Sequence, residues 1–204
     1  STPRGAHQPN GLLVRHKRAE RGIIANNSHW SSLLEQPLEI IVGQELLKRK
    51  MKLMVAESCT GGLIGHWITN VPGSSDYYLG SVTAYAYEAK QQLLGVRQST
   101  LLAHGAVSRE TVLEMACGVR SALAGFFPIE QTIGISVSGI AGPGGGLPDK
   151  PVGTVWIGLC AADASLAWRC QWQGDRLHNK EESARQALRL LLGYLQGSLP
   201  PESV

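Results

Sequence analysis

The sequence lacks a long hydrophobic run. No stretch approaches the ~18 consecutive apolar residues of a membrane-spanning helix, and no apolar signal-peptide core follows residue 1. The four cysteines form no C-x-x-C pair, and no histidine stands at zinc-ligand spacing from them. These absences argue against a membrane span, a secretory signal and a zinc site, and they favour a reducing, cytoplasmic compartment.

Several familiar catalytic and nucleotide-binding motifs are missing as well. Ser58 is flanked by Glu57 and Cys59, so the G-x-S-x-G motif of α/β hydrolases is absent there, and Gly61 stands where S-x-x-K requires a lysine. The glycine-rich stretch "SGIAGPGGG" is not G-x-G-x-x-G opening a helix, because Pro143 and the following "PDKP" prevent that helix. Any base that activates Ser58 must therefore come from elsewhere in the chain.

The small excess of positive charge is unevenly distributed. Residues 1–34 hold five basic residues and one acidic residue, whereas the remainder holds 14 basic and 15 acidic residues. The arm has few apolar residues and no clear period, so it cannot bury much surface. It is either a solvated, flexible leader or a tail for nucleic acid or an acidic partner. Its charges are not interleaved with aromatics, which disfavours nucleic acid.

From about residue 35 the pattern predicts one folded domain, residues 35–197, followed by a tail, residues 198–204. Apolar spacings of three and four predict helices from about residue 34 to the closing "KRKMK", and over residues 61–70, 109–124 and 179–196, and "EAKQQLLG" predicts a shorter one. Strands are expected in "KLMVA", "GSVTAYAY" and "QTIGISVS", followed by a hairpin of "VGTVWIGLCAA" and "SLAWRCQWQ". This alternation predicts an α/β fold, a three-layer α/β/α sandwich with a mixed, mostly parallel sheet.

Three unusual loops follow predicted strands: "ESCTGG", "GIAGPGGG" and "QGDR". Ligands of open α/β sheets bind beyond the carboxyl ends of the strands, so these loops are candidate site loops. In the first, Ser58 precedes a predicted helix N-terminus, where free N–H groups can hold an oxyanion or a phosphate. The structural alternative is that Ser58 or Thr60 only caps that helix. Cys59 is a rival nucleophile, since a helix N-terminus lowers a thiol pKa, but its side chain is expected to point away from that of Ser58, and a small buried thiol is the commoner case.

Two residues of "YAYEAK" are candidate partners of the serine. Tyr85 lies near the end of a predicted strand and Lys90 in the first turn of the next helix, so the tyrosine hydroxyl and the lysine amine can lie close together. A buried lysine loses pKa and can act as a base, and a tyrosine between lysine and serine can relay the proton. The alternative is a surface lysine and a half-buried edge aromatic. In the last loop, Arg176 either binds a phosphate through two parallel hydrogen bonds or is an ordinary surface arginine.

Taken together, these segments resemble one family. "AESCTGG", "VPGSS", "YAYEAK", "HGAVS", "SVSGIAGPGGG", "KPVGTVW" and "GDR" occur in the order typical of the CinA C-terminal domain family, and the sequence is similar to its nicotinamide mononucleotide amidases. The resemblance implies hydrolysis of the nucleotide's carboxamide to nicotinate mononucleotide and ammonia, in pyridine-nucleotide salvage, with neither a metal nor an organic cofactor. It also implies a homodimer or larger homo-oligomer, with no membrane partner.

The resemblance implies roles for individual residues. The nucleophile falls on Ser58 and the relay on Tyr85 and Lys90. The other positions near the substrate that the resemblance implies are Ser75, Ser138 and Arg176. From the residues themselves, the amides of Thr60, Gly61 and Gly62 are candidates for the oxyanion, and Gly139, Ala141, Gly142 and Arg176 are candidates for the ribose phosphate. The opposite placement of the two anions stays open.

The sequence departs from the family in places. Ala86 and Tyr87 replace the Ser-Asn of many relatives, and Tyr87 is large enough to crowd the pocket. The arm matches nothing in the family, and it is too short for the companion domain of two-domain relatives. The chain is thus expected to be a stand-alone form or part of a longer one. Two other readings stay open: a non-catalytic nucleotide-binding or competence-related interaction domain, and a cysteine hydrolase that pairs Cys59 with His66 or His104.

Overall fold

The chain divides into two units, residues Ser1–Glu35 and Gln36–Val204. The computed structural model describes residues 36–203, so the expectations for the basic arm lie outside the described residues. None of the described helices combines the length and apolarity that a membrane crossing requires.

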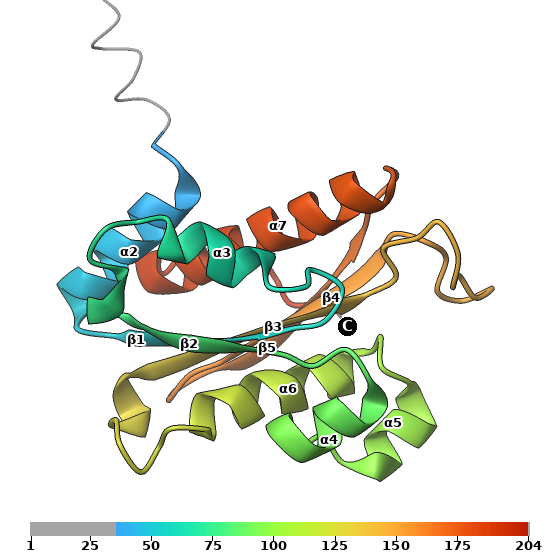
Figure 1. Cartoon of the computed structure of the whole chain (residues 1–204), viewed down its shortest axis with the longest axis horizontal. Coiled ribbons are helices and arrows are strands. Elements are labelled where there is room, and N and C mark those ends of the chain that lie inside the picture. The colour runs from blue at the N-terminus through green and yellow to red at the C-terminus, as the bar shows by residue number, and fades with distance from the viewer. Residues whose placement is uncertain (1–35, 204) are drawn as a thin grey trace, which may run out of the picture. The chain divides into compact units, whose positions relative to one another are not determined.

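A five-stranded sheet forms the middle layer, in the order β2-β1-β3-β4-β5 (Figure 1). β1 pairs in parallel with β2 and β3, whereas β4 runs antiparallel to both β3 and β5. The sheet is therefore mixed, with four strands running in one direction and β4 in the other, as the sequence predicts. The strands are β1 (Lys52–Glu57), β2 (Tyr78–Thr83), β3 (Thr132–Gly139), β4 (Thr154–Cys160) and β5 (Ser165–Gln171).

Helices cover both faces of the sheet, which confirms the three-layer arrangement. α2, α3 and α7 lie on one face and α4, α5 and α6 on the other (Figure 1). They span α2 (Leu38–Arg49), α3 (Leu63–Thr69), α4 (Tyr87–Leu94), α5 (Gln98–His104), α6 (Arg109–Ser121) and α7 (Arg176–Gln196), with short 3₁₀ helices at Ser74–Asp76 and Ile129–Gln131.

The predicted elements are present with small shifts at their ends. α7 begins three residues earlier than expected, because the Asp175 side chain accepts a hydrogen bond from the His178 amide and caps the helix. Ser108 caps α6 by accepting a hydrogen bond from the Thr111 amide. The sequence analysis missed α5, a helix of seven residues without a side-chain cap.

Side chains alternate between the two faces of β1, and this alternation sets the positions of the loop that follows. Leu53 and Val55 belong to the core under α2, α3 and α7, whereas Met54 and Ala56 belong to the core over α4 and α6. Both cores are buried, so a slip of β1 by one residue would move each set of side chains into the opposite core, which is packed to fit the other set.

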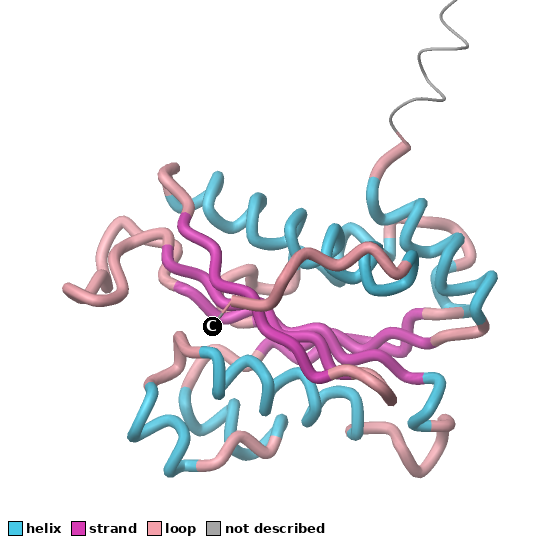
Figure 2. Tube along the Cα trace, turned by 180° about the vertical axis from the view of Figure 1, so that it is seen from behind, coloured by secondary structure: helices cyan, strands magenta, loops and turns pink. Residues whose placement is uncertain are grey.

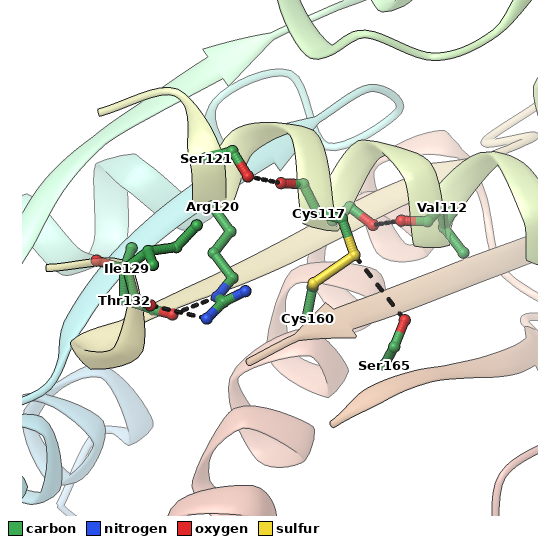
Figure 3. The surroundings of a disulfide bond; sticks show 9 residues. Val112, Cys117, Arg120, Ser121, Ile129, Thr132, Cys160 and Ser165 are labelled. Atoms are coloured by element: carbon green, nitrogen blue, oxygen red, sulfur yellow. Dashed lines mark hydrogen bonds between the residues drawn. A yellow bond between two sulfur atoms is a disulfide. The ribbon is translucent and has the colours of Figure 1, made fainter. Parts of the chain in front are cut away.

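A disulfide between Cys117 and Cys160 joins α6 to β4 on the second face (Figure 3). Cys59 and Cys170 are free. No sequence pattern indicated this pair, whose members are separated by 43 positions and meet only after α6 packs on the sheet. The expectation from the sequence was a reducing compartment, where such bonds are rare.

The C-terminal tail runs beside the outer strand β5 (Figure 2). The Ser203 amide donates to the Ala167 carbonyl, and the Arg169 amide donates to the Ser203 hydroxyl. Glu202 accepts from the Ala167 amide and pairs with Arg109 of α6. The tail thus covers the edge that β5 would otherwise expose.

Candidate active site

At the end of β1, three consecutive side chains point in alternating directions. Glu57 points to the α3 side, Ser58 to the α4 side, and Cys59 returns to the core under α3 and α7. This continues the alternation of β1 for two residues past its end. Ser58 therefore meets α4, the helix that carries Lys90.

Lys90 is the partner of Ser58. Its Nζ lies 3.0 Å from Ser58 Oγ, and the lysine is only 1% exposed. The amine also donates to the carbonyls of Ala84 at 2.7 Å and Tyr85 at 3.3 Å. A neutral amine has two hydrogens, so these two carbonyls can occupy both of them and leave the lone pair facing the serine hydroxyl.

Burial prepares Lys90 to act as a base. Removal of the ammonium from water lowers the pKa of Lys90 from 10.5 to about 8. No carboxylate lies within ion-pair distance of its Nζ in the described chain, so the charged form is held only by neutral carbonyls. About a tenth of the lysine is thus neutral at pH 7, which the free side chain would not provide.

Cys59 is not poised as a nucleophile. Burial raises the pKa of its thiol to about 12, against the small lowering effect of nearby lysines. Loss of hydration outweighs the helix N-terminus, so Cys59 is the buried thiol of the second alternative and not an activated one. His66 is exposed on α3, and His104 faces Glu110 at 3.5 Å, so neither lines the cavity that contains Cys59.

The cap of α3 is Glu57, and not Ser58 or Thr60 as in the alternative interpretation. Its buried carboxylate accepts hydrogen bonds from the amides of Gly62 at 3.0 Å, Ile64 at 3.2 Å and Gly65 at 3.0 Å. Ser58 is therefore released from capping. Glu57 lies at the end of β1, six positions before α3 begins at Leu63, so no local capping pattern identified it, although the helix dipole favours an acid at this end.

The capping changes which amides are open to a ligand. The Gly62 amide is taken by Glu57 and the Gly61 amide donates to the Ser58 carbonyl at 3.1 Å, so neither is open to an oxyanion as expected. Both glycines have positive φ, +66° and +94°, which turns the chain sharply into α3. The amides of Cys59 and Thr60 donate to no acceptor in the described chain.

Tyr85 does not lie between Lys90 and Ser58. Its side chain is 63% exposed and its hydroxyl accepts from Arg176 Nη2 at 3.0 Å. Arg176 Nη1 donates to the Gly142 carbonyl at 2.7 Å. The expected tyrosine relay is thus replaced by a direct lysine–serine contact, because the carbonyl of Tyr85 and not its phenol faces the amine. Arg176 links the glycine loop to Tyr85.

A loop before α6 forms another wall of the site. The Ser138 hydroxyl, at the end of β3, donates to the Ala106 carbonyl at 2.7 Å, and the Ala106 amide donates to the Tyr87 hydroxyl at 3.3 Å. Tyr87 was expected to crowd the pocket, but it supports this loop from outside the cavity lining. Ser138 likewise uses its proton to hold the loop.

Three further candidates from the sequence are Ser75, Thr60 and Gly139. Ser75 is exposed in the 3₁₀ helix before β2, at the opposite end of the strand from Tyr85, so the described chain does not bring it to Ser58. Thr60 is buried, and its Oγ1 has no hydrogen-bond partner in the described chain. A side chain at Gly139 would lie 2.4 Å from Val155, so this glycine is required by packing between β3 and β4.

Ser58, Lys90 and the loops around them enclose a cavity of about 190 Å³ at the carboxyl ends of β1 and β3. Lys180, one turn beyond Arg176 on α7, was not identified from the sequence; its Nζ lies 3.6 Å from the position that a Gly61 side chain would take. Among residues 36–203, no three His, Cys, Asp or Glu side chains gather in a way that could hold a metal ion. The lining residues are Ser58, Cys59, Tyr85, Lys90, Ala106, Val107, Ser138, Gly139, Ala141 and Arg176.

Fold and site together define a three-layer α/β protein with a buried serine–lysine pair at the carboxyl edge of its sheet. The sequence profile of the CinA C-terminal domain matches residues 35–195. The chain belongs to the CinA C-terminal domain family, as its motifs indicate.

Relatives and solved structures agree with this assignment. The chain is 52% identical over 151 residues to a CinA-like protein of Salinibacter ruber, covering 74% of this chain and 35% of that protein. With a CinA-like protein of Desulforapulum autotrophicum it shares 45% identity over 176 residues, 85% of this chain and 40% of the other. The chain thus spans about 35–40% of the length of these curated relatives.

Solved structures match nearly the whole of their own chains. A competence-damaged protein (CinA) superfamily protein from Klebsiella pneumoniae has a TM-score of 0.72 and 34% identity, covering 78% of this chain and 96% of that one. A competence/damage inducible protein from Agrobacterium tumefaciens has a TM-score of 0.70 and 33% identity, covering 79% and 97%.

Proposed function

We propose that this domain is an amidohydrolase that cleaves the carboxamide of nicotinamide mononucleotide, yielding nicotinate mononucleotide and ammonia. The observation that carries the proposal is the buried Lys90 amine, 3.0 Å from the Ser58 hydroxyl, with its pKa lowered to about 8. A lysine in this state can take the serine proton near neutral pH, and a serine so activated can attack an amide carbon.

The proposed reaction begins with transfer of the Ser58 proton to the neutral amine of Lys90 as Oγ attacks the carboxamide carbon. The carbonyls of Ala84 and Tyr85 stabilise the ammonium that forms. The open amides of Cys59 and Thr60 lie next to the nucleophile and would donate to the oxyanion. Lys90 then returns a proton to the departing nitrogen, and ammonia leaves an ester on Ser58.

Water completes the cycle. Lys90, neutral again, takes a proton from water, the hydroxide equivalent attacks the ester carbon, and the acid product leaves as Ser58 regains its proton. No step requires a redox partner. Ser58 and Lys90 both return to their starting states.

The charges around the cavity favour a phosphate-bearing substrate. Arg176 is exposed at the mouth, and its guanidinium is held by two uncharged oxygens, those of Gly142 and Tyr85. Lys180 adds a second cation one helical turn away. A phosphate at the mouth would pair with these cations while the ring carrying the carboxamide enters toward Ser58. This leaves the glycine loop to position Arg176 through the Gly142 carbonyl.

An ammonia-release assay tests the proposal. Purified protein should release ammonia from nicotinamide mononucleotide, and Ser58→Ala should abolish release while the far-UV circular dichroism spectrum is unchanged. The neighbouring Cys59→Ala variant is the matched control and should retain turnover, since the thiol stays protonated. Full activity of Ser58→Ala would contradict the mechanism. Nucleotide binding without ammonia release by the wild-type protein would favour the non-catalytic alternative.

A further inference from the structure

A second and larger cavity lies beside the first. Its volume is about 510 Å³, within the ~300–1,000 Å³ typical of small-molecule sites, and it shares Val107 with the cavity at Ser58. It lies on the α6 side of β4 and β5, under the loop that joins α5 to α6. The residues that line it are Ala103, His104, Val107, Ser108, Arg109, Glu110, Asp149, Lys150, Trp156 and Arg169.

The register of the sheet builds its floor. Ser138, Trp156 and Arg169 lie directly opposite one another on β3, β4 and β5, so their side chains share one face. Ser138 lines the first cavity, and the other two line the second. The half-buried indole of Trp156 therefore provides a flat aromatic surface between Ser138, which lines the first cavity, and the guanidinium of Arg169.

Two cations of this cavity are not neutralised by a carboxylate. Lys150 Nζ donates to the His104 carbonyl at 2.7 Å, and Arg169 Nη2 donates to the Asp149 carbonyl at 3.2 Å. Neither makes an ion pair within the part of the chain that is described. By contrast, Arg109 pairs with Glu202, and His104 faces Glu110. Lys150 and Arg169 can thus accept an anion without breaking an existing ion pair.

Asp149 is the remaining charged group of the lining. Its side chain makes no hydrogen bond or ion pair in the described residues, so both carboxylate oxygens can accept from a ligand hydroxyl. An acidic side chain that binds ribose hydroxyls is a common element of nucleotide sites. An aromatic platform, two cations and a carboxylate together match a planar base, a phosphate and a sugar.

We propose that this second cavity binds a ligand of the nucleoside monophosphate class, with the base on Trp156, the phosphate at Lys150 and Arg169, and the sugar hydroxyls at Asp149. The site is separate from the serine–lysine pair and does not depend on the amidase function. Lys150 holds the carbonyl of His104 at the end of α5. Ala106 and Val107, two and three positions further along, line the first cavity, so a ligand bound at Lys150 lies next to its wall.

Binding of adenosine 5′-monophosphate, which has no carboxamide to hydrolyse, tests the site by isothermal titration calorimetry. Binding should weaken about tenfold or more in Lys150→Gln and in Arg169→Gln, since each removes a charge-assisted contact. Trp156→Leu should weaken adenosine 5′-monophosphate more than ribose 5-phosphate, which lacks a base. The control variant Lys48→Gln, on α2, should bind as the wild type does.

Two results would overturn the proposal. One is no measurable binding of adenosine 5′-monophosphate at millimolar concentration. The other is binding that Arg176→Gln weakens while Lys150→Gln and Arg169→Gln leave it unchanged, because the nucleotide would then occupy the first cavity. Both Lys150 and Arg169 have side chains that reach solvent, so the variants should fold, and matching thermal melting curves would verify this.

Discussion

The amine of Lys90 and the hydroxyl of Ser58 are 3.0 Å apart, although the residues are separated by 32 positions in the chain. The contact exists because Ser58, the first residue after β1, lies on the α4 side of the sheet, while the turn after β2 places Lys90 in the first turn of α4. Two backbone carbonyls of that turn fix the amine. The pair is therefore built by the backbone on both sides and not by a further side chain.

The pH dependence of turnover should follow Lys90. Its pKa is lowered to about 8, so the amine is mostly charged below that pH and cannot accept the serine proton. We expect kcat/KM to rise about tenfold per pH unit below about pH 8 and to level off above it. The pH profile of ammonia release measures this.

Lys90→Arg provides the matched variant. Arginine keeps the positive charge but does not lose its proton at these pH values. Activity should fall by about 10²–10⁴-fold, the usual contribution of a general base. A variant with wild-type kcat/KM and an unchanged pH profile would show that another group is the base.

Arg176 should act on phosphate binding more than on chemistry. In Arg176→Gln we expect KM for nicotinamide mononucleotide to rise about tenfold or more with a smaller change in kcat, because a charge-assisted contact is lost. Arg189→Gln, elsewhere on α7, is the control. Nicotinamide riboside lacks the phosphate, so its turnover should be nearly insensitive to Arg176→Gln. Equal losses for both substrates would assign Arg176 a structural role through Tyr85 instead.

Glu57 should stabilise the fold from within. Its carboxylate accepts from three amides at the start of α3, and a glutamine there would turn an NH₂ donor toward an N–H donor. We expect Glu57→Gln to lower the free energy of unfolding by about 1–3 kcal/mol. Urea denaturation followed by circular dichroism measures the change. Glu88→Gln, exposed in the first turn of α4, should have little effect, and equal midpoints for the two variants would refute the cap.

The disulfide between Cys117 and Cys160 should add stability under oxidising conditions. Cross-links of this kind contribute about 2–4 kcal/mol, so reduction with dithiothreitol should shift the urea midpoint downward. Cys117→Ser should start from the lower midpoint and show no response to the reductant. If dithiothreitol leaves the wild-type midpoint in place, the bond contributes nothing to stability.

The residues that could be identified from the sequence are those whose local chemistry is unusual. A serine before two glycines, a lysine in the first turn of a helix and an arginine after a strand each follow a predicted strand, and such loops meet at one edge of a sheet. Ser58, Lys90 and Arg176 were found in this way, and all three line one cavity. Periodicity likewise predicted the layers, because buried faces require it.

What the sequence could not reveal depends on direction and packing. Whether Lys90 reaches Ser58 through the Tyr85 phenol or directly depends on which atoms of one turn face inward, and only the folded chain determines this. Glu57 became the cap because β1 ends one residue before Ser58. The pairing of Cys117 with Cys160, and the row of Ser138, Trp156 and Arg169, arise from packing and strand register between distant segments.

The amino-acid sequence by itself thus determined the alternation of helices and strands, the family and the edge of the sheet where chemistry can occur, because these follow from local patterns of polarity and turn residues. Only the tertiary structure decided which groups share a proton, which amides stay open and where a second cavity forms. Those properties depend on distances of a few ångströms between segments far apart in the chain, and on the water that their packing removes.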